Sequence, residues 1–115
     1  MILDNFLTAL QSTGILFARD AWDDMEPNTN YGVLVVDGKP NCIWGDNRIV
    51  YQCVTAKVYL YTFGDDKTPI KAVQQVLTDQ CASYVLSNSI FHEDIMGNEW
   101  EFTCQVDVTA DLAVV

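Results

Sequence analysis

The chain has 115 residues, half of them hydrophobic, and its sixteen acidic and six basic residues give a net charge of −10. This length predicts a single domain, residues 1–115, with its own hydrophobic core. The acidic balance argues against a protein that wraps or reads nucleic acid, because neutralising phosphates needs the opposite sign. The negative charge is compatible with a surface along which DNA passes without binding. It is equally compatible with a charge that only keeps the protein in solution.

The N-terminal half begins with an expected helix over residues 2–13, where apolar residues recur at helical spacing and Gly14 follows as a cap. Residues 15–22 are typical of a short strand. The polar, acidic stretch 23–30 contains a proline and asparagines and is expected to be a surface loop. The longest apolar runs are far shorter than the ~20 residues of a membrane span. No basic residue precedes Arg19, so we expect no secretory signal and synthesis in the cytoplasm.

Tyr31–Val36 is predicted to be the second strand, and Asp37-Gly38 after it is a strong signal for a hairpin turn. A short strand piece over 41–44 and a turn at 45–47 would follow. Residues 48–63 then alternate imperfectly between apolar and polar and are rich in Val, Tyr, Thr and Phe, as strands favour. Sixteen residues exceed the usual strand length of roughly 5–6, so we expect a hairpin over 41–63 that projects from the core and pairs with a neighbouring subunit.

The C-terminal half is predicted to hold a helix over residues 68–82, with Thr68 as its N-cap and Pro69 in its first turn. Strands are expected over 83–92 and 99–108, the latter with a regular apolar–polar alternation. Residues 109–115 have little to hold them and are expected to form a flexible C-terminal tail.

This order of elements predicts an α+β fold, in which an antiparallel or mixed sheet carries two helices packed on one face and a long projecting β-hairpin. The long strand presents bulky side chains on both faces. We therefore expect one face to be covered by another subunit, with Tyr59, Tyr61, Phe63 and Trp44 at the subunit interface. The loop 23–30 and the C-terminal residues are further candidates for contacts.

No pattern in the sequence predicts catalysis, so we expect no enzyme and no cofactor or metal. His92 precedes two acids, but no nucleophile is placed beside it, and a histidine in a turn is the better interpretation. Four acids form a group in this part of the chain: Asp20, Asp23, Asp24 and Glu26. They lack the spacing of a calcium-binding hand, which leaves a solvated acidic loop or a weak cation site. The four cysteines are too far apart for a chelating pair and are expected to be buried thiols.

Segments along nearly the whole chain resemble the tail terminators, or tail-to-head joining proteins, of long-tailed bacteriophages. The segments that carry the resemblance are ILDNFLTALQSTGI (2–15), FARDAW (17–22), YGVLVVDG (31–38), NRIVYQ (47–52), VYLYTFGDDKTPIKAVQQVL (58–77) and EWEFTCQVDV (99–108).

The resemblance implies a structural virion protein that forms a ring, as a hexamer, at the head-proximal end of the tail. Such a ring would stop polymerisation of the tail tube and bind both the tail tube protein and the head–tail connector, while DNA passes through its lumen without specific binding. Two alternatives stay open. One is another neck, head-completion or tail tube protein, and the other is a small domain that binds a ligand or cation.

Overall fold

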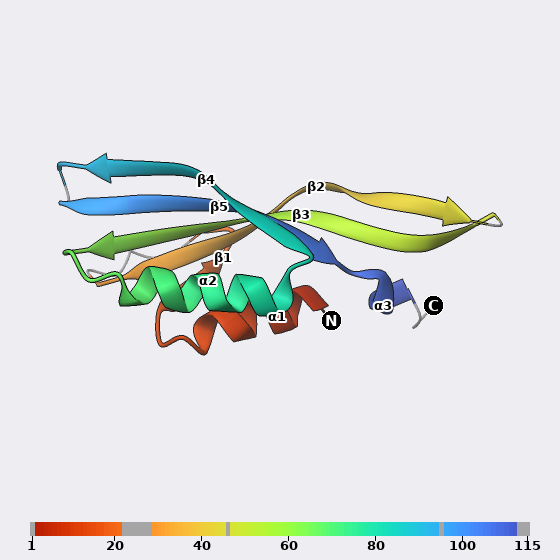
Figure 1. The fold of residues 1–115 in the computed structure, drawn as a ribbon, viewed down its shortest axis with the longest axis horizontal. Coiled ribbons are helices and arrows are strands. Elements are labelled where there is room, and N and C mark those ends of the chain that lie inside the picture. The colour runs from red at the N-terminus through yellow and green to blue at the C-terminus, as the bar shows by residue number, and fades with distance from the viewer. Residues whose placement is uncertain (1, 22–28, 46, 95, 113–115) are drawn as a thin grey trace.

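Five strands form one mixed sheet in the computed structural model, which describes residues 2–21, 29–45, 47–94 and 96–112 (Figure 1). In chain order the elements are α1 (Ile2–Gln11), β1 (Leu16–Arg19), β2 (Tyr31–Gly45), β3 (Arg48–Phe63), α2 (Thr68–Gln80), β4 (Ser83–His92), β5 (Gly97–Asp107) and α3 (Thr109–Leu112). The strands lie in the order β1-β2-β3-β5-β4; β1 pairs parallel with β2, and the other three pairings are antiparallel.

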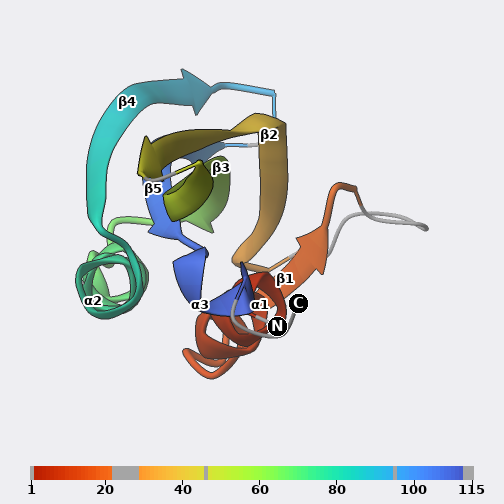
Figure 2. The same ribbon diagram turned by 90° about the vertical axis from the view of Figure 1, so that its right-hand side faces the viewer.

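Helices α1 and α2 pack on the same face of this sheet, which confirms the predicted α+β class (Figure 2). α1 buries Phe6 and Leu10, and α2 buries Val73 and Leu77. Each pair is separated by four positions, so the two side chains lie on one side of their helix. Full burial of such a side chain contributes ~1.5–3 kcal/mol, so these four residues hold the helices to the sheet.

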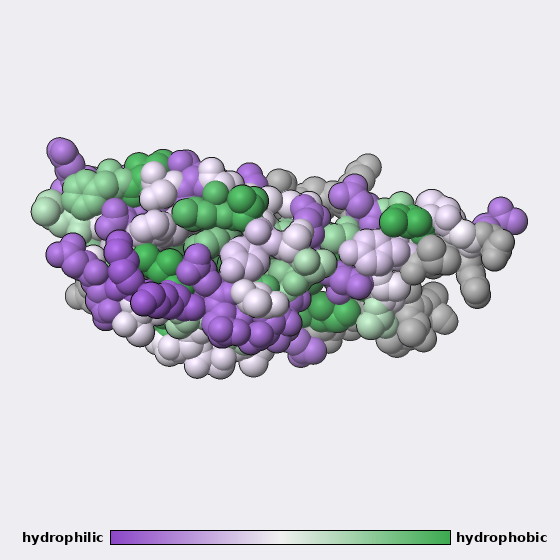
Figure 3. All heavy atoms as spheres, in the orientation of Figure 1, coloured by the Kyte–Doolittle hydropathy of each residue, from purple (hydrophilic) through white to green (hydrophobic). Residues whose placement is uncertain are grey.

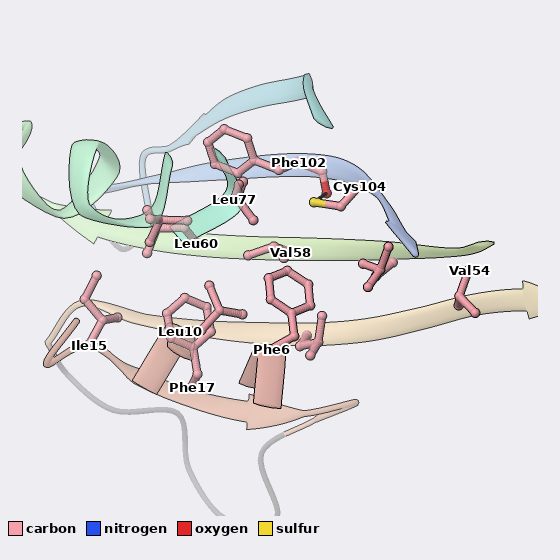
Figure 4. Packing of buried hydrophobic residues seen from close by; sticks show 14 of the residues in the cluster. Phe6, Leu10, Ile15, Phe17, Val54, Val58, Leu60, Leu77, Phe102 and Cys104 are labelled. Carbon is pink, nitrogen blue, oxygen red and sulfur yellow. Dashed lines mark hydrogen bonds between the residues drawn. The ribbon is translucent and has the colours of Figure 1, made fainter. Parts of the chain in front are cut away.

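The sheet supplies its half of the core from alternate positions of β3 and β5 (Figure 4). Val58 and Leu60 of β3 lie opposite Phe102 and Trp100 of β5 in the strand register. Val58, Leu60 and Phe102 are completely buried. The alternation predicted for the last strand is therefore confirmed, and its regularity comes from having one face on the core and the other turned away from it.

The expected turn at Asp37-Gly38 is wrong, because β2 continues without a break to Gly45. Between the pairs Asp37↔Thr55 and Asn41↔Cys53, β2 advances four residues while β3 advances two. The two extra residues are absorbed as a bulge, so the turn-forming sequence distorts the strand instead of reversing it. The reversal comes at 45–48, where Asn47 adopts a left-handed backbone (φ 65°) that asparagine tolerates.

Thr68 is not the N-cap of α2 as predicted, because Lys67 holds that position and makes no capping bond with its side chain. Thr68 is the first residue of the helix, and the carboxylate of Asp66 accepts hydrogen bonds from both the Thr68 backbone N–H (2.9 Å) and its hydroxyl (2.7 Å). Pro69 lies in the first turn, as expected. The predicted helix over 68–82 ends two residues early at Gln80, and the first helix also ends two residues early at Gln11.

The β2–β3 hairpin extends past the rest of the sheet in its strand register. β5 reaches only to Cys53 on β3, and β1 reaches only to Leu34 on β2. The structure is correspondingly elongated, with extents of 54 × 25 × 22 Å. That residues 41–63 project as an arm to bind a neighbour stays a prediction.

The predicted C-terminal tail begins as the short helix α3, which lies beside the hairpin. The backbone N–H of Val108 donates to the carbonyl of Gln52 (2.9 Å), and the Thr109 hydroxyl accepts from the Gln52 backbone N–H (2.9 Å). These bonds hold the chain after β5 to β3 at the position where β5 stops pairing. Residues 113–115 lie outside the described part.

Candidate functional site

The candidate site is the face of the sheet turned away from α1 and α2. In β3 the odd-numbered residues Lys57, Tyr59, Tyr61 and Phe63 point to this face, since their even-numbered neighbours are buried in the helix-covered core. All four are partly buried. Three of the four residues predicted for a subunit interface are therefore brought together in one row.

The aromatic row is extended across the sheet by Tyr31 of β2, which the sequence analysis did not assign to the site. Its ring stacks on that of Tyr61, with centroids 4.7 Å apart and an angle of 16° between the rings, and it lies 6.4 Å from the ring of Phe63. An open hollow of about 300 Å³ adjoins these rings. Its lining consists of Asp20, Ala21, Tyr31, Val33, Val35, Tyr59 and Tyr61.

Two carboxylates of β5 lie opposite the two tyrosines. The register pairs Tyr61 with Glu99 and Tyr59 with Glu101. Burial, followed by a hydrogen bond to Glu99, raises the pKa of Tyr61 well above its ordinary value. A hydrogen bond from Ser87 lowers the pKa of Glu101, and Tyr59 adds a smaller effect in the same direction. The raised pKa keeps the hydroxyl of Tyr61 a neutral hydrogen-bond donor to a higher pH than that of an ordinary tyrosine.

Ser87 reaches Glu101 because β4 carries a bulge at that position. The register of β4 on β5 shifts between Leu86 and Asn88, which leaves Ser87 as the extra residue. Its hydroxyl donates to the Glu101 carboxylate (2.8 Å) and accepts from the Thr103 hydroxyl (2.9 Å). The hydroxyls of Ser87 and Thr103 and the carboxylate of Glu101 therefore hold one another in place by hydrogen bonds.

Trp44, the fourth predicted interface residue, lies far from this face. It pairs with Ile49 near the tip of the hairpin, ten positions along β3 from Tyr59. At ~3.3 Å per residue this is ~33 Å. Its side chain is 65% exposed. The predicted set therefore belongs to two separate surfaces, the aromatic face and the hairpin tip.

His92 is the last residue of β4, and its Nε2 lies 3.4 Å from a carboxylate oxygen of Glu99. This is an ion-pair distance, but the two atoms are not aligned as a hydrogen bond, and Nε2 is buried. In the described residues we find no nucleophile set beside this pair. His92 therefore belongs to the strand, immediately before the turn in which the sequence analysis placed it.

The described residues contain no cluster of His, Cys, Asp or Glu that could hold a metal ion. Of the four acids that the sequence analysis considered for a cation, Asp20 is described and exposed, and the other three lie outside the described residues. The four cysteines are free thiols, of which Cys53 and Cys104 are buried and Cys42 and Cys81 are partly exposed. A hydrogen bond with Cys104 lowers the pKa of the Cys81 thiol and raises that of Cys104.

Comparison with known proteins does not assign the chain to a family. A scan against protein-family models gives no match, and a search of curated proteins finds no relative. Among the helices of the described ranges, none has the length and apolar character needed to cross a membrane.

Proposed function

We propose that this protein is a structural component of a bacteriophage tail, a terminator that closes into a ring at the head-proximal end. In this proposal the ring stops growth of the tail tube, binds the head–tail connector and leaves a lumen for DNA. The resemblance of the sequence segments is the source of the specific role. The physical features below support the more general part, which is self-assembly without catalysis.

The observation that carries the proposal is the aromatic face. α1 and α2 both pack on the opposite face, so Tyr59, Tyr61 and Phe63 are left at the surface of the sheet away from them. Aromatic residues are enriched at protein–protein interfaces, because they offer a large apolar area with few rotatable bonds. Glu99 and Glu101 beside them would restrict which partner fits.

The charge of the chain supports a role beside DNA that involves no binding to it. With a net charge of −10, the surface repels a polyanion on average. A ring whose lumen carries part of this charge would let DNA pass without a strong contact. Localisation in the virion, after synthesis in the host cytoplasm, belongs to the same proposal.

The decisive experiment is the absolute mass of the purified protein by light scattering, with negative-stain images of the same fraction. Closed rings, and capping of purified tail tubes when these are added, are the expected results. Open-ended tubes would instead indicate a tail tube protein. A strict monomer that neither assembles nor binds tail tubes would contradict the proposal.

The aromatic face is tested by Tyr59→Ala together with Tyr61→Ala. We expect this variant to lose assembly. Lys57→Ala is the matched control, because it changes the same face without removing an aromatic ring. Retention of rings by the tyrosine variant would show that this face is not a subunit contact.

The ligand-binding alternative rests on the hollow beside Tyr31, Tyr59 and Tyr61. It predicts a reproducible rise in melting temperature with calcium or a small metabolite. Such a shift in a protein that stays monomeric would favour this alternative over the structural role.

A further inference from the structure

The strand β4 forms an open edge of the sheet. It pairs with β5 on one side, and no described strand lies on the other. An open edge presents unpaired backbone N–H and C=O groups that can pair with another chain, and proteins commonly protect it with charges or proline. β4 has neither from Ser83 to Phe91, and the uncharged run begins at Gln80. The bulge at Ser87 is the one protective feature it carries.

β4 is also where exposed apolar side chains gather. Of eight large hydrophobic residues that are exposed in the described part of the chain, four belong to this strand: Val85 (58%), Leu86 (43%), Ile90 (40%) and Phe91 (50%). Figure 3 shows green apolar side chains over this end of the sheet, above the purple hydrophilic surface of α2. An apolar edge strand of this kind is unusual for a protein that remains a monomer.

A second open edge lies on the opposite side of the sheet, along the outer half of β2. β1 pairs with β2 only as far as Leu34, so from Val35 to Gly45 no described strand lies on that side. Two further exposed apolar residues, Ile43 (58%) and Trp44 (65%), lie on this segment. Residues 40–45 carry no charge.

We propose that β4 of one copy pairs with the outer edge of β2, over residues 41–45, in the next copy. Each edge has backbone N–H and C=O groups with no described partner strand, which the other edge can pair, and each carries exposed apolar side chains. Two copies with a charge of −10 repel each other, so a contact is favoured where the paired segments bring no like charges together. Both edges satisfy this condition.

The position of the two edges makes the contact head-to-tail. In Figure 1 the β4–β5 turn and the tip of the β2–β3 hairpin lie at opposite ends of the structure, which is 54 Å long. β4 is the outermost strand on one side of the sheet, and the outer half of β2, beyond β1, is the open edge on the other side. A single copy therefore cannot join its own two edges. A heterologous contact of this type repeats from copy to copy and closes into a ring if the rotation allows.

A symmetric contact between two β4 strands is the main competitor. It would cover Val85, Leu86, Ile90 and Phe91 but leave Ile43 and Trp44 exposed in both copies. The head-to-tail contact covers apolar side chains of both groups, which is why we favour it. This inference rests on the proposed self-assembly and adds a contact at the strand edges to the one proposed at the aromatic face.

The test uses two variants, each blocked at one edge. Val85→Lys with Ile90→Lys places charges on β4, and Ile43→Lys with Trp44→Lys places them on β2. All four side chains are at least 40% exposed, so the fold tolerates the changes, and circular dichroism checks this. Gln75→Lys with Gln80→Lys, on the exposed side of α2, is the control with the same added charge.

The expected result is that the wild type and the control assemble, and that each blocked variant alone stays monomeric. An equimolar mixture of the two blocked variants retains one intact pair of edges, so it forms a dimer that grows no further. Light scattering distinguishes these masses directly.

Three other outcomes overturn the inference in different ways. Dimers of the β2 variant alone would indicate the symmetric β4 contact. Normal assembly of both blocked variants would show that copies meet elsewhere, for example at the aromatic face, while the proposed self-assembly stands. A wild type that stays monomeric at its solubility limit would contradict this inference, and it would contradict the proposed function as well if the monomer also failed to bind added tail tubes.

Discussion

The rings of Tyr31 and Tyr61 lie stacked across the β2–β3 pair, 4.7 Å apart, and the hydroxyl of Tyr61 is bonded to Glu99 on the strand beyond. One tyrosine thus joins three adjacent strands on the face away from the helices. The contact combines ring stacking with a hydrogen bond to a charged acceptor, two interactions that each favour a single side-chain position.

Tyr61→Phe should make the stability of the protein less sensitive to alkaline pH. The folded-state pKa of Tyr61 is raised, so its contribution is fully present below the unfolded value of about 10 and is lost as the pH rises further. The wild type should therefore lose more stability above this pH than the variant, which keeps every other tyrosine. Urea midpoints measured across the alkaline range check this, and parallel curves for the two proteins would contradict it.

Asp66→Ala should destabilise α2, because it removes the acceptor of the two bonds from Thr68. These bonds lower the pKa of Asp66, so the stability they contribute is present above the unfolded pKa of about 3.9 and is lost as the pH falls through the lower folded value. The melting temperature of the variant should lie below that of the wild type at neutral pH, and the two should converge in acid.

Asp65→Ala is the matched control for this change, since it removes the same charge from the same turn. If both variants melted alike at neutral pH, the loss would come from charge and not from the two hydrogen bonds to Thr68.

Trp100→Phe should cost about 1–3 kcal/mol, because it leaves the buried hydroxyl of Thr62 without the indole N–H, which lies 3.1 Å away. Thr62→Val in the same protein removes the second polar partner and should recover most of the loss. Urea unfolding followed by circular dichroism measures all three variants. Additive losses in the double variant would show that the bond has no energetic role.

Gly32→Ala should destabilise the protein by about 1–3 kcal/mol, the usual cost of overpacking. A methyl group at this position would overlap the ring of Phe17, which is buried, so the ring or the strand β1 that carries it would have to move. Phe17→Leu reduces the overlap, and we expect the double variant to be more stable than the sum of the single losses predicts. If the losses in free energy of unfolding were strictly additive in a double-mutant cycle, the overlap with the ring of Phe17 would not be the cause of the destabilisation.

The two partly exposed cysteines should react first with iodoacetamide in the native protein. Cys42 and Cys81 are accessible, whereas Cys53 and Cys104 are buried and should react only after unfolding. The lowered pKa of Cys81 favours the reactive thiolate, so its labelling should persist to lower pH than that of an ordinary thiol. Mass spectrometry of peptides from timed samples identifies each site, and early labelling of Cys104 would contradict the structure.

The α+β class and most strands could be predicted from the sequence because their patterns are local. The alternation in β5 and the apolar stripes of α1 and α2 each arise from burying one side of an element, and the structure confirms them. Asp37-Gly38 failed as a turn because the pairing of β2 with β3 continues on both sides of it. A local turn signal cannot reveal that a strand has a partner beyond the turn.

The aromatic face could be predicted only in part. The side on which Tyr59, Tyr61 and Phe63 lie follows from alternation within one strand. The partners of these residues, Tyr31, Glu99 and Glu101, depend on which strands are neighbours and in what register, and the sequence pattern does not contain this information. Trp44 was assigned to the same interface because it is aromatic, although the bulged hairpin carries it far along the sheet.

The central position of β3 has a consequence for synthesis of the chain on the ribosome. β3 is made well before β5, yet eleven register pairs join them, from Cys53↔Asp107 to Phe63↔Gly97. Until β5 has emerged, the nascent chain holds a β2–β3 hairpin with one edge of β3 unpaired and the core positions of β3 without Phe102, Cys104 and Val106. Chains that stall before Gly97 should therefore be those most in need of a chaperone, and a pause at that point would favour mispairing with a neighbouring chain.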